Sequence, residues 1–226
     1  NVFGPIYNTQ CLCDCNTSLI VAYCTEAQQS DVGTLLPMLD AGQAVLGHTI
    51  KYVGTDKTYC TILELKGCEE RHIELLADVP DNAFGKKKHG AEAERREEIR
   101  NQFIWDEDLQ TYHCPAGHLL TFQYNETCPR AGGRSLSARR FHCAPEHCLS
   151  CDLASLCAKN PASGRTIKRL DGQELLDKQR ERMKQDDAKE MARHRNSIAE
   201  LTFGDIKQHR NGRRMHGRGL TRARTE

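Results

Sequence analysis

Long apolar runs are absent from this chain of 226 residues. No stretch approaches the roughly 20 apolar residues that a membrane-spanning helix needs. The first residues, which begin at Asn1, show neither the basic nor the apolar part of a secretory leader. Hydrophobic residues make up 38% of the chain and charged residues 28%. This composition is typical of a soluble globular protein with one large domain or two small ones.

A strong net charge is also lacking, since the formal value is only +1. The positive charge is concentrated at the end, where seven Lys or Arg follow from Lys207 onward against one acidic residue, Glu226. Such a segment favours binding to phosphate groups, although a solvated basic tail has the same composition. Because the chain starts without Met and stops inside this segment, we expect a fragment that lacks residues at both ends.

The twelve cysteines form two groups. A small disulfide-stabilised secreted domain would be shorter and denser in cysteine. Six cysteines lie in stretches that resemble strands and helices, where we expect buried small hydrophobic side chains: Cys11, Cys13, Cys15, Cys24, Cys60 and Cys68. The other six lie in loop-like sequence, where clustered thiols favour metal binding: Cys114, Cys128, Cys143, Cys148, Cys151 and Cys157.

The first 80 residues predict an α/β domain in the order ββαβαβ. Residues 7–14 and 18–24 predict an antiparallel hairpin, and Asp31 is predicted to cap a helix that ends at Gly47. A strand at 49–56, a helix at 61–70 and a strand at 73–80 follow. Asp14 and Asp56 each end a predicted strand, and ligands of open α/β sheets gather at strand ends.

The rest of the chain predicts a charged linker or surface helix at 81–101, a hairpin at 103–115, loops to Asn160 and helices at 171–185 and 187–209. In the last helix Ile198, Ala199, Leu201, Phe203 and Ile206 are predicted to form one apolar arc. Glu200 and Lys207 are two turns apart, so they should lie on the same side of the helix.

Several motifs, in order along almost the whole chain, resemble the DDE transposases of bacterial insertion sequences, in the group with a cysteine-bearing insertion before the last catalytic helix. The resemblance rests on these segments: "YNTQCLCD", "VGTDKTY", "YHCPAGHLL", "CLSCDLASLC", "GRTIKR", "RERMK" and "AELTFGDIKQHRNGRRMHGRGL". It implies metal-dependent cleavage and strand transfer of DNA in the transposition of an insertion sequence.

The implied fold is an α/β, ribonuclease H-like mixed sheet with helices, interrupted by a cysteine-rich insertion. Residues 1–80 would form the first part of the catalytic core, 81–170 the linker and insertion, and 171–226 the helical end of the core. Asp14, Asp56 and Glu200 would be the catalytic carboxylates. Their oxygen atoms suit Mg²⁺ or Mn²⁺, and three carboxylates can hold two ions about 4 Å apart.

Positive side chains near the last helix would contact the DNA backbone. Lys207 could touch a phosphate beside the catalytic site as a point charge, although a surface lysine has the same appearance. Arg213, Arg214 and Arg218 are interspersed with glycines and are expected to grip phosphates without reading bases. The chain departs from the family pattern at Ile6, Thr58 and Ala192, but it keeps an arginine upstream of Glu200, Arg195.

The cysteine insertion predicts one structural Zn²⁺, because four thiolates suit a tetrahedral zinc site. The expected ligands are Cys114, Cys148, Cys151 and Cys157, with Cys128, Cys143, His118 and His147 as further candidates. An iron–sulfur cluster needs the same four thiolates, and unligated thiols are the third reading.

The resemblance implies double-stranded DNA, both transposon ends and target, as the partner. It also implies assembly of a homo-oligomer on DNA, no membrane, and a cytoplasmic location at the bacterial nucleoid. A second reading is a non-catalytic or degenerate zinc-containing protein that binds nucleic acid. The two readings differ over whether the three carboxylates lie within metal-bridging distance, and an inactive fragment lies between them.

Overall fold

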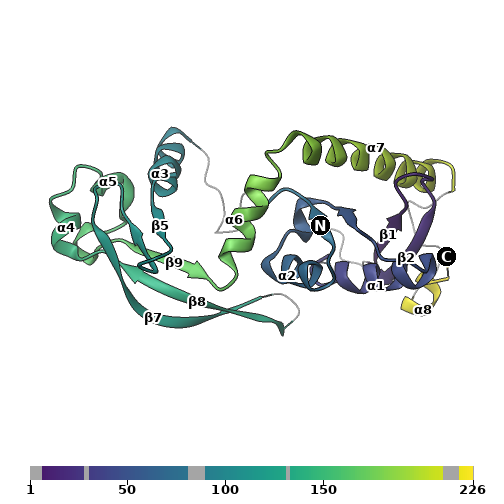
Figure 1. Cartoon of the computed structure of the whole chain (residues 1–226), viewed down its shortest axis with the longest axis horizontal. Coiled ribbons are helices and arrows are strands. Elements are labelled where there is room, and N and C mark those ends of the chain that lie inside the picture. The colour runs from purple at the N-terminus through teal and green to yellow at the C-terminus, as the bar shows by residue number, and fades with distance from the viewer. Residues whose placement is uncertain (1–6, 28–30, 81–89, 131–132, 211–218, 226) are drawn as a thin grey trace. The chain divides into compact units, whose positions relative to one another are not determined.

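The computed structural model describes residues 7–27, 31–80, 90–130, 133–210 and 219–225. The chain forms two compact units (Figure 1). Unit 1 contains residues 1–83 and 174–226, and unit 2 contains residues 84–173. Both contain helices and strands, so the fold is mixed α/β. Unit 2 is therefore inserted between two segments that fold together.

Unit 1 begins with the predicted antiparallel hairpin, β1 (Asn8–Cys13) paired with β2 (Ile20–Glu26). Helix α1 (Leu35–Leu46) follows and ends at Gly47, whose φ of 70° is a left-handed conformation that glycine adopts readily. The prediction that Asp31 caps this helix is wrong, because the N-cap residue is Thr34. The Asp31 carboxylate instead accepts hydrogen bonds from the side-chain amides of Asn8 and Gln10, since its position beside β1 offers those donors.

The second half of this segment is a parallel β-α-β arrangement. Strand β3 (Tyr52–Gly54) pairs with β4 (Glu74–Leu76), and α2 (Ile62–Glu70) connects them. Thr61 caps α2 through its side chain, which accepts from the Glu64 backbone N–H. Among the described residues, no strand hydrogen bonds join the β3–β4 pair to the β1–β2 pair. The described part of unit 1 therefore contains two sheets of two strands each, whereas one mixed sheet was predicted.

The chain returns to unit 1 through α6 (Gln173–Arg182), which is joined to β4 by a buried glutamine. The Gln179 side-chain amide donates to two carbonyl oxygens, those of Leu75 and Ala77, at 2.9 Å each. Gln179 is only 7% exposed. Its two N–H groups therefore satisfy one carbonyl group of β4 and one in the residue that follows the strand.

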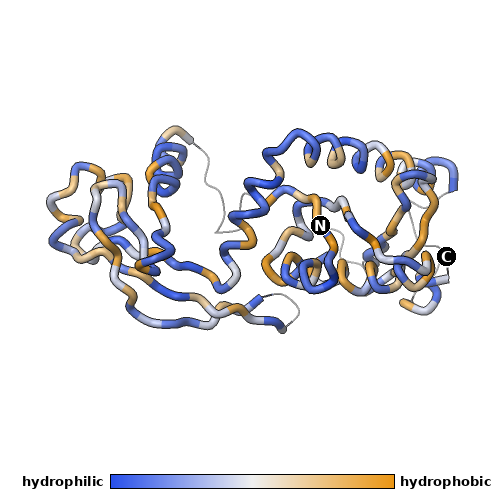
Figure 2. Tube along the Cα trace, in the orientation of Figure 1, coloured by the Kyte–Doolittle hydropathy of each residue, from blue (hydrophilic) through white to orange (hydrophobic). Residues whose placement is uncertain are grey.

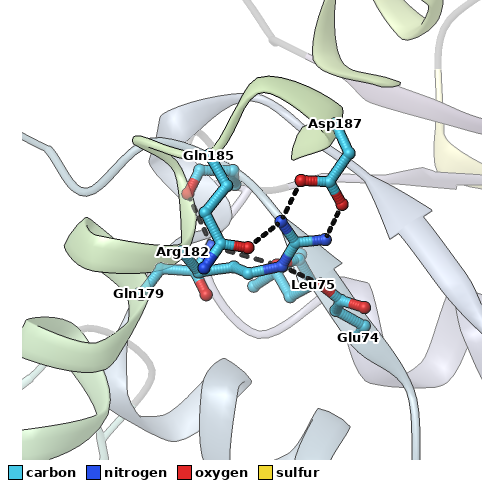
Figure 3. A network of polar contacts seen from close by, with 7 residues as sticks. Glu74, Leu75, Gln179, Arg182, Gln185 and Asp187 are labelled. Atoms are coloured by element: carbon cyan, nitrogen blue, oxygen red, sulfur yellow. Dashed lines mark hydrogen bonds and ion pairs between the residues drawn. The ribbon is translucent and has the colours of Figure 1, made fainter. Parts of the chain in front are cut away.

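Arg182, at the end of α6, fixes the start of the next helix, α7 (Asp186–Gln208; Figure 3). Its guanidinium makes two parallel hydrogen bonds to the Asp187 carboxylate, at 2.9 and 2.7 Å, and a third to Glu74 of β4. It also donates to the Gln185 side chain at 2.9 Å. The hydrogen bonds from Arg182 lower the pKa of Asp187. One cation thus joins α6, α7 and β4.

Helix α7 confirms the predicted long helix, but its apolar arc differs in one residue. Ile198 is buried, whereas Leu201 is 69% exposed. Beyond the helix, the short helix α8 (Leu220–Ala223) packs against β2. There, Arg224 donates to the Thr25 carbonyl and to the Glu26 carboxylate. This contact fixes the end of the chain on the first hairpin.

Unit 2 is an antiparallel sheet of five strands in the order β5-β6-β7-β8-β9 (Figure 1). Its strands are β5 (Ile104–Asp106), β6 (Thr111–His113), β7 (Leu119–Pro129), β8 (Ser135–His142) and β9 (Thr166–Leu170). The β5–β6 hairpin confirms the one predicted at 103–115. The prediction of loops up to Asn160 is wrong, since β7 and β8 form a long hairpin there. Leu120, Ala138 and Phe141 are buried, but the many polar side chains around them left no regular alternation of polar and apolar residues in the sequence.

Helices complete unit 2: α3 (Ala91–Asn101), α4 (Pro145–Leu149) and α5 (Ala154–Cys157), with a 3₁₀ turn at Pro161–Ser163. Figure 2 shows α3 as mostly hydrophilic, in agreement with the charged surface helix predicted from the sequence. Arg96 joins α3 to α5 by donating to the carbonyl groups of Ser155 and Leu156. These bonds satisfy carbonyls around α5, a helix too short to pair them itself.

The core of unit 2 is aromatic. Trp105, Tyr112 and Phe141 meet edge to face with ring centroids 5.0 to 5.7 Å apart. The Arg169 guanidinium lies 4.1 Å from the Trp105 ring centroid, close enough for a cation–π interaction. Phe141, within this cluster, and Leu120, packed in the same core, are almost fully buried. The three rings and Leu120 therefore form a small core together with Cys143 and Cys148.

The cysteines of unit 1 follow the prediction only in part. Cys60 and Cys68 are buried, at 2% and 1% exposure, and burial raises the pKa of the Cys60 thiol to about 12 and that of Cys68 to about 11. Cys15 is exposed, so it is not the buried residue that was predicted. It lies in the turn after β1, where it has no sheet to cover it.

We predict that Gln179→Met lowers the free energy of unfolding by about 1–3 kcal/mol. Methionine preserves the length of the side chain but removes the donor to the carbonyl groups of Leu75 and Ala77. A buried polar group without a partner costs about that amount. Urea denaturation measures the effect. Gln208→Met, at an exposed position at the end of α7, is the control and should change stability by less than about 0.5 kcal/mol. Equal stability of both variants would show that the Gln179 bonds contribute nothing.

Candidate catalytic cleft and cysteine cavity

Unit 1 contains a cavity of about 820 Å³. Its walls come from the end of β1 and the turn after it, from residues 48–54 leading into β3, and from one side of α7. The volume is within the range of pockets that bind ligands. The two separate strand pairs of unit 1 therefore both contribute to the same cavity.

Asp14 lines this cavity directly after β1. Its carboxylate accepts hydrogen bonds from the Thr17 hydroxyl at 2.6 Å and from the Thr17 backbone N–H at 3.0 Å. These bonds, with a smaller contribution from the nearby His48, lower the pKa of Asp14. Hydrogen bonds to the charged form keep the carboxylate ionised. Asp14 is thus available as an anionic oxygen donor at the cavity wall.

Asp56 lies two residues beyond the end of β3 and is exposed. Its side chain caps the short 3₁₀ turn Lys57–Tyr59 by accepting from the Thr58 backbone N–H at 3.2 Å. The Thr55 backbone N–H just before it donates to the Leu76 carbonyl of β4 at 3.2 Å. The parallel strand pair therefore fixes the backbone that carries Asp56.

Two contacts place α7 beside the ends of β1 and β3. The Cys13 thiol lies 3.8 Å from the Thr202 hydroxyl, and the Arg195 side chain covers Gly54. These contacts are seven residues apart on α7, or about 10 Å along the helix. Glu200 lies on the helix between them. The elements that carry the three predicted catalytic carboxylates thus meet around one segment of α7.

The carboxylate groups themselves are not brought together. Of the three, only Asp14 lines the cavity. Glu200 is exposed and lies about 100° around the helix from Ala199, which lines it. In the part of the chain that the structure describes, no group of three His, Cys, Asp or Glu side chains is positioned to hold a metal ion. The donor chemistry of the three carboxylates suits Mg²⁺, and their role as its ligands stays a prediction.

Lys207 lies on the same side of α7 as Glu200, because α7 is continuous over both residues. Its ammonium group is 5.9 Å from the centroid of the Phe203 ring. Lys207 is exposed, so its charge is accessible to an anion in solution. Arg213, Arg214 and Arg218 lie outside the described residues.

A polar stripe that was not predicted from the sequence lies on the cavity side of α7 and consists of Asp187, Glu190 and His194. Their spacing of three and four residues places them on one side of a helix and is the signal that could have revealed the stripe. Arg195, predicted only as the arginine upstream of Glu200, also lines the cavity.

A second, smaller cavity of about 20 Å³ lies inside unit 2. Its lining includes five of the six cysteines of the second group: Cys114, Cys143, Cys148, Cys151 and Cys157. His118 and His147 also line it, with rings stacked 4.1 Å apart. Cys128 instead lies on β7, near Lys168 and Glu126. The other three further ligand candidates, Cys143, His118 and His147, all line the cavity.

Backbone hydrogen bonds fix the turn that carries Cys114. The His118 backbone N–H donates to the Cys114 sulfur at 3.3 Å, and the Gly117 backbone N–H donates to the Cys114 carbonyl at 2.8 Å. Among the described residues, no three of the cysteine and histidine side chains at this cavity are positioned to hold a metal ion, so zinc binding stays a prediction.

Comparison with known proteins gives one match. A family model described as a transposase DDE domain matches residues 113–226. The chain matches no curated protein and no solved structure. None of the helices among the described residues is long and apolar enough to cross a membrane.

We predict that Gly54→Ala displaces α7 from β3 and lowers stability by about 1–3 kcal/mol, the usual cost of overpacking. An added Cβ would lie 2.9 Å from Cγ and 3.1 Å from Cβ of Arg195, near the base of that side chain, where it cannot rotate away. Gly204→Ala is the control on α7, since nothing lies within 4 Å of its added Cβ. It should raise stability by up to about 1 kcal/mol through helix propensity. Thermal unfolding of both variants measures the difference, and a stable Gly54→Ala would contradict the contact.

Proposed function

The chain belongs to the transposase DDE domain family, and on that premise we propose that it cuts DNA strands and joins them to new sites in the transposition of an insertion sequence. The observation that carries the proposal is the family match over residues 113–226, which includes the whole of α7. The family implies nuclease and transposition chemistry, and the substrate is double-stranded DNA.

Asp14, Asp56 and Glu200 are the proposed metal-binding carboxylates. Support comes from the two contacts that hold α7 against the ends of β1 and β3. When bound, a pair of Mg²⁺ ions would supply a nucleophilic oxygen and stabilise the oxygen that leaves phosphorus. Asp14 is kept ionised by Thr17, while Asp56 and Glu200 are exposed, so ions in solution can reach both carboxylates.

The catalytic core is proposed to be ribonuclease H-like. The order of a β1–β2 hairpin, α1 and a parallel β3-α2-β4 unit supports this arrangement. Both strand pairs line the cavity of unit 1, so one pair could approach the other at that place. Joining them into one sheet would bring the backbone after β1 toward the backbone after β3.

DNA backbone binding is assigned to the basic end of the chain. Lys207 supplies an exposed ammonium group on the side of α7 that carries Glu200. Arg213, Arg214 and Arg218 follow the helix, and their guanidinium groups suit phosphate oxygens. We propose that these residues hold DNA beside the carboxylates without distinguishing its bases.

The carboxylates are tested by nicking of supercoiled plasmid DNA in Mg²⁺. Asp14→Asn, Asp56→Asn and Glu200→Gln should each reduce nicking by more than about 100-fold, since loss of even an outer-shell partner of a metal costs about 10- to 100-fold. Each change keeps the size of the side chain and removes only its charge. Nicking that persists in a variant would remove that residue from the proposed site.

Glu190→Gln is the matched control, because Glu190 is on α7 but faces the cavity rather than the side of Glu200. It should keep most of the activity. If Glu190→Gln abolished nicking and Glu200→Gln did not, the carboxylates at the cavity wall would form the metal site instead. No nicking by the unchanged chain, with DNA binding retained, would favour the non-catalytic alternative.

The basic segment is tested by the salt dependence of DNA binding. Arg213→Ala, Arg214→Ala and Arg218→Ala should each reduce the slope of log affinity against log salt by about one unit, equally for all DNA sequences. Lys66→Ala, which removes an exposed lysine from α2, is the control and should leave the slope unchanged. Unchanged slopes in the arginine variants would identify a solvated tail, and a loss limited to one sequence would indicate base recognition.

A further inference from the structure

The cysteine cavity of unit 2 contains a cation as well as thiols. Arg165 lines it together with the five cysteines. Its Nη1 atom donates to the Cys157 carbonyl at 2.8 Å, and its guanidinium lies 5.6 Å from the centroid of the Phe103 ring. The Nε atom is buried, and among the described residues it has no hydrogen-bond partner. One N–H of a permanent cation is therefore left unsatisfied at this position.

Among the described residues, no carboxylate lines this cavity. On the adjacent helix α3, Glu92 pairs with Arg96 and Glu97 with Arg100. The Arg165 side chain is half-buried. A charge that is partly removed from water is stabilised by a partner of opposite sign, and the residues that line the cavity provide none.

Neutral thiols cannot provide that anion, but metal-bound thiolates can. When four thiols bind Zn²⁺ they release four protons, and the resulting centre has two negative charges in excess. That charge would compensate Arg165, and a thiolate sulfur would accept from its free Nε–H. The cavity volume of about 20 Å³ is enough for one occupant the size of a water molecule.

We propose that this cavity is a structural zinc–thiolate centre with Arg165 as its counter-charge. The ligands are Cys114, Cys148, Cys151 and Cys157, which all line the cavity. Zinc binding would draw their sulfur atoms inward, since these side chains are not yet grouped around one point. Arg165 is a positioning residue, because it acts through the thiolates.

Cys143 is assigned a different role from the ligands. It directly follows β8, is only 2% exposed, and packs in the same cluster as Leu120 and Phe141. Its thiol forms a hydrogen bond with Cys148. It can therefore donate to the Cys148 thiolate from outside the zinc coordination shell.

The test measures bound metal in the whole chain, purified in reducing buffer, by elemental analysis. One zinc per chain is expected. Cys114→Ser, Cys148→Ser, Cys151→Ser and Cys157→Ser should each lose it, whereas Cys128→Ser should retain it as the matched control. Cys143→Ser should retain one zinc bound more weakly. Substitution with Co²⁺ should give the visible absorbance of a tetrahedral thiolate site.

The role of Arg165 is tested by competition for zinc with a chromophoric chelator. Arg165→Gln should weaken zinc affinity by about 10- to 100-fold, the usual cost of losing an outer-shell partner. Arg165→Lys should restore part of the affinity, because it returns the charge but not the Nε–H. Arg139→Gln is the control, since Arg139 stacks over Trp105 at 5.4 Å but does not line the cavity.

Four results would overturn the proposal. The first is a purified chain that contains no zinc and does not bind Co²⁺. The second is a chain that contains iron, with the visible absorbance of an iron–sulfur cluster. A disulfide between cavity cysteines in the absence of metal would also contradict it. Equal zinc affinities for Arg165→Gln and the unchanged chain would show that Arg165 does not act as the counter-charge. Each of these readouts is independent of DNA cleavage.

Discussion

The guanidinium of Arg182 is the interaction on which the arrangement of unit 1 depends. It joins β4 through Glu74 to the first turn of α7 through Asp187 (Figure 3). Asp187 lies near the positive end of the α7 dipole, where a carboxylate is also stabilised. Because α7 is a single helix of 23 residues, fixing its first turn also sets the direction of the helix and the positions of the residues along it. The positions of Arg195, Glu200 and Thr202 relative to the strands therefore depend on this one pair of carboxylates.

Sequence patterns were sufficient where one segment determines its own structure. The hairpin β1–β2, the helix ending at Gly47 and the long helix α7 were predicted because strand alternation, a glycine C-cap and helical periodicity are local signals. The strands β7 and β8 were missed because most of their side chains are exposed, and only Leu120, Cys128, Ala138 and Phe141 are buried. Asp31 was misassigned as a cap since its partners, Asn8 and Gln10, are more than 20 residues away.

In the candidate sites, too, sequence patterns predicted the features that depend on one segment and not those that depend on packing between segments. Spacing alone predicted that Glu200 and Lys207 share a side of α7, and the continuous helix confirms it. Spacing could not predict which side faces the cavity, because that depends on the packing of Arg195 over Gly54 and of Thr202 beside Cys13. In unit 2, the sequence identified the clustered thiols but not Arg165. Nothing in a cysteine pattern indicates that a cation separated from them along the chain will share their cavity.

The placement of unit 2 within the chain explains why a metal centre would matter to the whole protein. Its 90 residues, 84–173, separate β4 from α6, yet Gln179 of α6 must reach the carbonyl groups of β4. Closing a flexible loop of that length costs about 4 kcal/mol in chain entropy beyond a constant. A folded insertion shortens the flexible part of the loop and so reduces that cost. The core of unit 2 is small, since it consists of an aromatic cluster that includes Phe141 and of a few further side chains such as Leu120. A structural zinc would contribute its binding free energy directly to folding. A zinc centre in unit 2 would therefore stabilise the contact between β4 and α6, and through Arg182 the position of the helix that carries Glu200.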